Sequence, residues 1–360
     1  MPKVSKGGVT LRDVAERVGV TPAAVSMALL GRGRISEQKR LDIQNAAAEL
    51  GYVGSSAARA LRSQRADTIA LIVPTTATHV FGHAYFTHVL QGVIEAANER
   101  NIQVLISTNA DQDNGLTAYE RVMRSNMVDG AIVTSAAIDD STVERLNEGG
   151  VPVVLIGNFP YLQDPVTVGV DDRAASVLAT DHLIGVHGRT RLLHVAGPLD
   201  HQTGLDRSIG FTSAVEAAGI SSGSMIVEGD LSEGGGADAI LRLGASVTDF
   251  DGIFFANDDM AYGAIQELRR QGVRVPADVS IIGFDDFGLS RAVSPSITTI
   301  HVPAEEMARA ATGRLLDIVE GIAGWSRRDF EVSLVARESC GCGPLRVAAA
   351  APAAGSSHHT

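Results

Sequence analysis

The sequence predicts a multidomain protein: an all-α helix-turn-helix head, followed by an α/β body of two doubly wound parallel-sheet subdomains. Two observations lead to this class. Apolar residues recur at helical spacing within a strongly basic segment, the first 66 residues. From Thr68 onward, short apolar runs alternate with longer helical patterns, which is the rhythm of parallel sheets covered by helices. The chain has 360 residues, enough for a small domain and two medium ones.

The charge distribution separates the head from the body. Residues 1–66 contain eleven Lys or Arg and five Asp or Glu, a formal charge of +6, whereas the other residues hold 19 basic and 37 acidic side chains, a formal charge of −18. A basic head attracts a phosphate backbone, and an acidic body repels DNA. No apolar run reaches the roughly 18 residues that a membrane helix needs, and we find no signal-peptide core. We therefore expect a cytoplasmic, nucleoid-associated protein without a membrane partner.

The first two helices are predicted over residues 11–18 and 22–29. Thr10 and Thr21 precede them and can accept hydrogen bonds from the free amides of each first turn. Gly19 supplies the turn between the helices. The pattern is helix, turn, helix, although on its own it also fits an ordinary helical hairpin.

A third helix is predicted from its cap, Ser36, to Leu50, and Gly51 ends it. Three helices of this length make a minimal DNA-binding head. The residues expected on the core face of the third helix are Leu41, Ile43, Ala46, Ala47 and Leu50.

The body is predicted to alternate strands and helices. Its apolar runs are short and continuous, as in strands that are buried on both faces. This β-α-β rhythm predicts two halves, each about the size of a domain. The expected strands are 69–73, 104–106, 130–133, 153–156, 191–195, 252–255 and 279–282, and the expected helices are 86–100, 118–125, 174–184, 209–218 and 260–271.

Cys340 and Cys342 are the two cysteines of the sequence. A single C-x-C pair cannot supply a structural zinc site by itself and is poorly placed for a disulfide, so we interpret both as free thiols without a function. Residues 347–360 are rich in alanine and are predicted to form a disordered tail.

Polar side chains follow two of the predicted strands. Asn257 and Asp258 come after residues 252–255, and Asp285 and Asp286 come after residues 279–282. Taken alone, two acidic pairs suggest a metal site or general acid–base chemistry. The sequence contains no H-E-x-x-H, G-x-S-x-G or G-x-x-x-x-G-K-[ST] motif, so we expect neither an enzyme nor a bound cofactor or metal.

Several segments, in the same order, resemble one family. The segments VTLRDVAERVGVTPAAVS, SEQKR, SSAARALRS and FFANDDMAYGAIQELRRQGVRVPADVSIIGFDDF are similar to the lactose repressor (LacI) and purine repressor family of ligand-responsive transcription regulators. The resemblance runs from about Val9 to Pro344. It implies a periplasmic-binding-protein-like body and a repressor that binds a palindromic operator in double-stranded DNA as a homodimer. A small-molecule effector is then expected in the cleft between the two subdomains.

The resemblance also implies the domain boundaries. The head covers residues 1–54, and the hinge helix with its linker covers 55–66. The N-terminal effector subdomain is 67–169 plus 300–325, and the C-terminal effector subdomain is 170–297 plus 329–346. The chain is expected to cross between them near Gly169, Ile297 to Ile300, and Trp325 to Asp329.

DNA contacts are assigned by the resemblance to the head and the hinge. Leu61 matches a position whose side chain wedges between base steps in the minor groove, with Ala58 packed beside it and Arg59 near phosphate. Many members have an arginine after the serine of the recognition helix, but here Met27 follows Ser26, and methionine cannot make the bidentate bond to guanine. The expected DNA-binding residues are Thr10, Thr21, Pro22, Ala23, Ser26, Met27, Arg34, Ala58, Arg59 and Leu61.

The effector site is assigned in the same way. Arg207, in a loop after a strand, supplies a guanidinium group, and Asn257 and Asp285 supply an amide and a carboxylate. We expect Asp258 to cap a helix that begins at Met260, and Asp171 and Asp172 to cap the helix after them. Asn158 stands where some sugar-binding members have an acid, which leaves the ligand class open. The expected effector-binding residues are Tyr85, Phe86, Thr203, Arg207, Asn257 and Asp285, and the expected effector is a sugar, with a nucleoside or purine as the alternative.

Two other classes share parts of this pattern. A sugar-binding transport-type protein has a two-lobed body but no basic head, and an enzyme acting in the cleft needs a catalytic motif that we do not find. The basic head therefore favours a DNA-binding regulator. One small head reads few bases, so we expect a two-fold pair on a pseudo-palindromic operator.

Overall fold

The computed structural model describes residues 9–29, 31, 33–52, 65–109, 117–125, 127–138, 140, 142–343 and 346–347. The chain forms two compact units, Met1–Asp67 and Thr68–Thr360. The predicted hinge residues Ala58, Arg59 and Leu61 lie outside the described residues, as does the predicted tail from residue 348 onward. Within the described residues, no helix is both long enough and apolar enough to cross a membrane.

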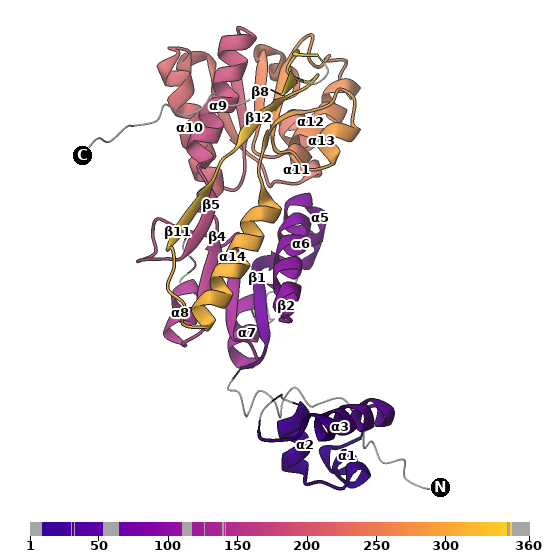
Figure 1. Cartoon of the computed structure of the whole chain (residues 1–360). Helices are drawn as coiled ribbons and strands as arrows, with labels where there is room; N and C mark the ends of the chain where they lie inside the picture. The colour runs from indigo at the N-terminus through magenta and orange to yellow at the C-terminus, as the bar shows by residue number, and fades with distance from the viewer. Residues whose placement is uncertain are drawn as a thin grey trace, which may run out of the picture. The chain divides into compact units, whose positions relative to one another are not determined.

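The first unit contains the three predicted helices, α1 (Leu11–Val18), α2 (Pro22–Leu29) and α3 (Glu37–Leu50) (Figure 1). Thr10 begins α1 with a capping box, in which the Thr10 hydroxyl accepts from the Asp13 amide and the Asp13 carboxylate accepts from the Thr10 amide. Gly19 ends α1 in the left-handed conformation, at φ 67°. These local signals set the length of α1.

A small apolar core holds the three helices together. Leu41, expected in it, is 47% exposed. Leu41 stands two residues before the buried Ile43, so it lies on the opposite side of α3. The buried members of the core are Val14, Ala15, Val25, Ala28, Ile43, Ala46 and Ala47.

The first sheet of the second unit consists of parallel strands in the order β11-β5-β4-β3-β1-β2. Its strands are β1 (Thr68–Thr76), β2 (Gln103–Asn109), β3 (Gly130–Thr134), β4 (Val153–Ile156), β5 (Thr167–Val170) and β11 (Arg327–Phe330). The helices beside it are α5 (Ala77–Gly82), α6 (Ala84–Glu99), α7 (Ala118–Ser125), α8 (Thr142–Glu148) and α14 (Ala304–Val319).

Helix α14 comes late in the chain yet packs in the first subdomain, against α6 (Figure 1). The two helices approach closely at Gly92, where a Cβ atom would lie 2.3 Å from the carbonyl oxygen of Glu305. Only glycine allows this approach. The last part of the sequence therefore completes the first subdomain.

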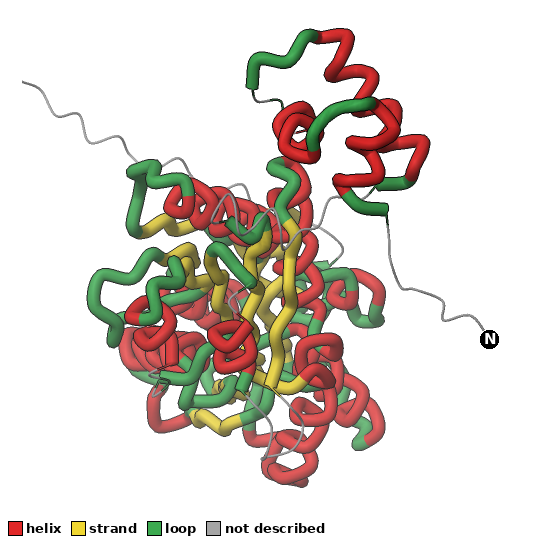
Figure 2. Tube along the Cα trace, turned by 90° about the horizontal axis from the view of Figure 1, so that it is seen from below, coloured by secondary structure: helices red, strands yellow, loops and turns green. Residues whose placement is uncertain are grey.

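The second sheet has the order β13-β12-β10-β9-β8-β6-β7. Strand β12 runs antiparallel to both of its neighbours, β10 and β13. Figure 2 shows helices on both faces of the strands. The strands are β6 (Leu192–Ala196), β7 (Met225–Glu228), β8 (Gly252–Phe255), β9 (Ser280–Asp285), β10 (Thr298–His301), β12 (Ser333–Ala336) and β13 (Arg346–Val347). The helices are α9 (Asp172–Asp181), the π-helix η1 (His182–Val186), α10 (Gln202–Ala217), the 3₁₀-helices η2 (Ser221–Gly223) and η3 (Gly244–Asp249), α11 (Glu233–Leu243), α12 (Asp258–Arg270) and α13 (Leu289–Ala292).

The fold class predicted for the head and the body is confirmed, and the chain crosses between the sheets within a few residues of the expected positions. The chain leaves the first sheet after Val170, returns after His301 and crosses again after Phe330. Residues 298–301, where a crossing was expected, form β10 of the second sheet, and residues 327–330 form β11 of the first. Neither TTIH nor the exposed, charged RRDF is a continuous apolar run, so neither segment carries the pattern from which the other strands were predicted.

One apolar core runs through both subdomains. It includes Ile69 and Val168 beneath the first sheet and Leu192, Phe254 and Phe284 beneath the second. Each subdomain has a further core of its own on the other face of its sheet. The shared core joins the subdomains beside the ends of their strands, where a cleft opens.

Candidate effector site and DNA-reading surface

A cleft lies between the two subdomains, and it encloses about 1000 Å³ of space, including the part that is open to solvent. Its walls are formed by the segments that follow β4, β5, β6, β8 and β9, together with the start of α6. The carboxyl ends of parallel strands in both sheets thus face one cavity, which is the usual ligand position in open α/β sheets. The predicted effector residues all line it: Tyr85, Phe86, Thr203, Arg207, Asn257 and Asp285.

Arg207 is buried in the cleft wall with a fixed orientation. Its Nε donates to Oδ1 of Asp172 at 2.8 Å, and its Nη1 donates to the carbonyl oxygen of Ala256. The guanidinium carbon lies 3.5 Å from the ring centroid of Phe284. These contacts use Nε and Nη1 and fix the plane of the guanidinium group. A ligand in the cleft would therefore meet Nη2 as a donor with a fixed orientation.

Arg207 and Thr203 lie on α10 and not on a loop as expected. The first turn of α10 packs against the preceding loop, and a Cβ atom at Gly204 would lie 2.3 Å from the carbonyl oxygen of Pro198. Glycine is a weak helix former, so helix propensity does not predict a helix at this turn. Packing, and not local preference, starts α10 at Gln202.

Asp172 belongs to the site although the sequence indicated only a helix cap. Asp171 does cap α9, because its carboxylate accepts from the Ala174 amide at 3.0 Å. Asp172 instead turns into the cleft and binds Arg207. Burial raises the pKa of Asp172, and the neighbouring Arg207 opposes that rise.

Asp285 ends β9 with the backbone in the left-handed half of conformational space, at φ 112°. This conformation is costly for a residue with a side chain, and such strain gathers at functional sites. Loss of solvent around the carboxyl group raises the pKa of Asp285 to about 7, although Arg207 acts in the opposite direction. The carboxyl group can therefore change its charge near neutral pH.

Asn257, and not Asp258 as expected, caps α12. Asn257 is the N-cap of α12, and its Oδ1 accepts from the Met260 amide at 2.9 Å while its Nδ2 donates to the carbonyl oxygen of Leu231. Helix α12 accordingly begins at Asp258, and Asp258 is not its cap. Asn257 still lines the cleft, but the structure of the protein already engages both ends of its amide.

Asp258 and Asp286 form a network of buried polar contacts next to Asp285, behind the wall of the cleft. The Asp286 amide donates to Oδ2 of Asp258 at 2.9 Å, and the Asp286 carboxylate binds Arg291 and Arg337. Burial raises the pKa of Asp258 well above its usual range. Burial would also raise the pKa of Asp286, but its hydrogen bonds with His301, Arg291 and Arg337 hold that pKa below its usual range. Their surroundings therefore favour the neutral form of Asp258 and the ionised form of Asp286.

The aromatic wall predicted for the cleft is present. The rings of Tyr85 and Phe86 meet edge to face, with centroids 5.4 Å apart. Burial raises the pKa of Tyr85 to about 12, and its hydroxyl forms a hydrogen bond with the side chain of Thr134. Tyr85 is therefore a neutral phenol that can cover the apolar face of a ligand.

Three histidines that the sequence analysis missed also line the cleft: His79, His83 and His201. Nε2 of His83 lies 3.2 Å from Nδ1 of His79, and Nδ1 of His83 lies 3.2 Å from Oδ2 of Asp259, which belongs to the other subdomain. His79 and His83 are four residues apart, a spacing that places two side chains on one helix face, so the sequence did carry a signal for this pair. His201 comes from a distant segment, and only the fold brings it to the same cleft.

Other contacts join the two walls of the cleft. Asn158, after β4, donates from Nδ2 to Oδ2 of Asp206 on α10 at 2.9 Å, and its Oδ1 accepts from Arg327 at 3.2 Å. The amide of Ile138 donates to the carbonyl oxygen of Asp200 at 2.8 Å. The cleft is thus held closed by polar contacts at its edge.

The predicted DNA-reading residues of the head lie mostly on its surface. Pro22, Ala23 and Met27 on α2, and Arg34 after it, are exposed, and Ser26 is half-buried. The hydroxyls of Thr10 and Thr21 cap α1 and α2, with Thr21 accepting from the Ala24 amide at 3.2 Å. The start of α2 therefore presents apolar side chains, supported by two capped helices.

Comparison with known proteins agrees with this architecture. Residues 10–55 match the family model of bacterial regulatory proteins, lacI family, and residues 180–340 match that of the periplasmic binding protein-like domain. The chain is 32% identical over 336 residues to the HTH-type transcriptional regulator CelR of Thermobifida fusca, covering 92% of this chain and 98% of that protein. It is 29% identical over 341 residues to the HTH-type transcriptional repressor CytR of Escherichia coli strain K12, covering 94% and 98%.

Solved structures give the same result. A complex of the transcriptional regulator CelR with cellobiose is 30% identical, with a TM-score of 0.70, and the match covers 92% of this chain and 99% of that one. A lac repressor dimer bound to operator and the anti-inducer ONPF shares the fold, at 24% identity, a TM-score of 0.80 and coverage of 93% and 99%. The chain therefore belongs to the lacI family of bacterial regulatory proteins and is a ligand-responsive, DNA-binding transcription regulator.

Proposed function

We propose that this regulator is a repressor that acts in the cytoplasm, binds a small polyhydroxylated effector, a sugar, in its cleft, and binds a palindromic operator as a homodimer. The observation that carries the effector assignment is the arrangement of Arg207, Asp172 and Asp285 around one cavity. A guanidinium edge and carboxylate oxygens can donate to and accept from adjacent hydroxyls at the same time.

The remaining lining suits a sugar as well. Sugars expose an apolar ring face beside their hydroxyls, and Tyr85 and Phe86 offer an aromatic surface for that face. The relative CelR has been solved with cellobiose, which makes cellobiose the first probe to test. The same aromatic pair favours a second candidate, a nucleoside, whose base would stack where the sugar face lies.

The proposed mechanism couples the cleft to the head through the closed arrangement of the subdomains. An effector that contacts both walls binds the closed arrangement more tightly than the open one. The difference between these two affinities sets how far the effector shifts the equilibrium toward the closed arrangement. In the homodimer this shift changes the spacing of the two hinges and thus the fit of the heads to two half-sites. The cleft binds the effector without turning it over.

The effector assignment is tested by titration calorimetry of the full chain with cellobiose, glucose, ribose, adenosine and cytidine. We expect saturable binding of a sugar, with the ligand recovered unchanged after incubation. Operator sites mapped across the genome supply the DNA for fluorescence anisotropy with and without that sugar. Turnover that Asp285→Asn abolishes would show an enzyme, and binding of nucleosides alone would select the second candidate.

The hinge assignment is tested at Leu61. If Leu61 wedges between base steps, Leu61→Ala leaves the head folded but reduces operator affinity strongly and reduces DNA bending. Gel mobility with circularly permuted operator fragments measures both. Unchanged affinity and unchanged bending would exclude the wedge, and Ser63→Ala in the same segment serves as the control.

A further inference from the structure

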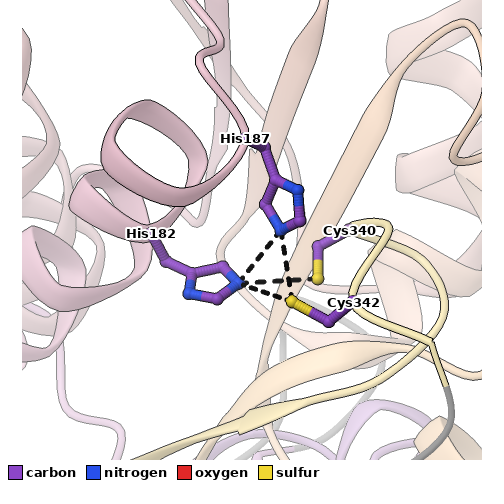
Figure 3. Close-up of side chains that lie close together, drawn as sticks. All are labelled: His182, His187, Cys340 and Cys342. Atoms are coloured by element: carbon purple, nitrogen blue, oxygen red, sulfur yellow. Dashed lines mark hydrogen bonds between the residues drawn. The ribbon is translucent and has the colours of Figure 1, made fainter.

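Four side chains that can bind a metal converge outside the effector cleft (Figure 3). His182 begins the π-helix η1, and His187 follows its last residue. Cys340 and Cys342 lie more than 150 residues later, beyond β12. The π-helix and the C-terminal segment thus bring together two residues each.

Local backbone geometry makes each pair face the same way. At 3.6 residues per turn, positions five apart on an α-helix diverge by about 140°. The i→i+5 turn of a π-helix brings His187 back to the side of His182. Side chains two apart on an extended chain usually point in the same direction, but here residues 338–341 form a turn, and Gly341 at φ 106° directs both thiols toward the imidazoles.

All the distances between the four ligand atoms are within 4.8 Å, and four of the six are close to the edges of a metal tetrahedron. In a tetrahedral zinc site, with bonds of about 2.05 Å to nitrogen and about 2.3 Å to sulfur, two nitrogens lie about 3.3 Å apart and a nitrogen and a sulfur lie about 3.6 Å apart. The two Nε2 atoms are 3.2 Å apart. Sγ of Cys342 lies 3.3 Å from each Nε2, and Sγ of Cys340 lies 3.6 Å from Nε2 of His182.

Hydrogen bonds alone do not explain this convergence. Nε2 of His182 lies within 3.6 Å of three polar atoms, yet an imidazole nitrogen carries either one proton or one lone pair. A cation among the four atoms would satisfy all of them together.

The surroundings also suit thiolate ligands. The hydroxyl of Thr298 donates to Sγ of Cys340 at 3.0 Å, and donors of this kind orient and stabilise a metal-bound thiolate. Cys340 is fully buried, and Cys342 is half-buried. Two thiolates and two neutral imidazoles form the Cys₂His₂ set of structural zinc sites, whose four positions are all filled by protein.

We propose that His182, His187, Cys340 and Cys342 bind one zinc ion in a closed tetrahedral site that fastens the C-terminal segment to the end of α9. Binding releases the two thiol protons to solvent and forms two Zn–S and two Zn–N bonds. Helix α9 begins at Asp172, which holds Arg207 in the effector cleft. The ion therefore fixes the far end of the helix that carries one wall of that cleft.

The wild-type protein gives the first test. His358 and His359 are replaced by serine both in the protein that serves as wild type and in every variant, so that they cannot bind metal. After purification without chelator, we expect one zinc per chain by mass spectrometry of the metal. Cobalt added to the stripped protein should give thiolate-to-cobalt charge-transfer bands and the strong visible bands of tetrahedral cobalt. Two thiols should become reactive toward Ellman's reagent only after zinc is removed.

Variants assign the ligands. Cys342→Ser and His187→Gln should each lose most of the bound zinc and the cobalt charge-transfer bands that depend on a complete site. The matched control is His88→Gln, since His88 is also half-buried but pairs with Glu305 outside the cluster. It should keep one zinc per chain. Zinc should also raise the melting temperature of the wild type but not that of His187→Gln.

Three results would overturn the proposal. The first is a stripped wild type that binds neither zinc nor cobalt, and the second is a His187→Gln variant that binds both metals as the wild type does. The third is a Cys340–Cys342 disulfide that zinc does not prevent, seen as an intact mass lower by two hydrogens under non-reducing conditions. The measurements on the wild type decide the question even if a variant fails to fold.

Discussion

Asp285 joins the charge state of the effector cleft to pH. Its carboxyl group has a pKa of about 7 because solvent is excluded around it, and Arg207 only partly offsets this effect. The folded chain holds this proton more tightly than an unfolded chain, in which an Asp titrates near 3.8. The stability contributed by the neutral form is therefore present at low pH and is lost as pH rises from about 4 to 7.

Effector binding should show the opposite dependence on pH. If the Asp285 carboxylate accepts hydrogen bonds from a sugar, protonation removes an acceptor. Affinity should then fall about tenfold between pH 8 and pH 6, the limit for one proton with a pKa of about 7. Calorimetry across this range with the sugar that binds provides the measurement. Asp285→Asn should bind weakly with no such slope, and an equal slope in that variant would assign the proton to another group.

Arg207→Lys tests whether the cleft needs a fork or only a positive charge. Lysine keeps the charge but cannot bind Asp172 and the Ala256 carbonyl oxygen together while lying flat over Phe284. We expect a loss of about 1–3 kcal/mol in effector binding, roughly 5- to 150-fold. Calorimetry at pH 8 measures it, with Arg191→Lys as the exposed control, since Arg191 pairs with Asp251 away from the cleft. An affinity within twofold of the wild type would show that charge alone suffices.

Among the elements, α1 shows how a short helix depends on its cap. Thr10 and Asp13 each satisfy an amide of the other at the start of this eight-residue helix. Thr10 was assigned to DNA binding, and this capping role offers a different reason for its presence. The two roles lead to different expectations for substitutions.

Thr10→Ala should lower the stability of the head by about 1 kcal/mol, the usual cost of removing a cap. Thr10→Ser and Thr10→Asn should restore both the stability and the operator affinity, because both side chains cap well. Amide hydrogen exchange across α1 and anisotropy with operator DNA measure the two effects. If Ser and Asn restore the stability but not the DNA binding, Thr10 contacts DNA directly.

Elements with strong local signals could be predicted from the sequence, and elements set by packing could not. Capping threonines, glycine stops and apolar runs predicted α1, α2, α3 and most of the parallel strands. The start of α10 depends on packing of a glycine-bearing turn against the loop just before it, and the π-helix after α9 has no signal in the apolar spacing. The same cause explains why Arg207 could be assigned from a motif whereas Asp172 and the His182 cluster could not.

At the scale of the whole molecule, closure of the cleft depends on few polar contacts. Asn158 joins Asp206 of the second subdomain to Arg327 of β11. Asn158→Ala removes both contacts, and because the contact with Asp206 crosses the cleft, we expect the open arrangement to gain population and effector affinity to fall severalfold. Small-angle scattering and calorimetry measure the two changes. Gln163→Ala, at an exposed position of the same loop, should change neither, and an unaltered Asn158→Ala would show that closure depends on the other contacts.

The repeated crossing of the chain has a consequence during synthesis. The head is complete once residue 52 has left the ribosome, because its core uses only nearby residues. The first sheet lacks its edge strand until residue 330 is made, and α14, which packs on α6, comes from residues 304–319. The DNA-binding head can therefore fold hundreds of residues before either half of the body is complete. A nascent chain that stalls late would carry a finished head with no working effector cleft to control it.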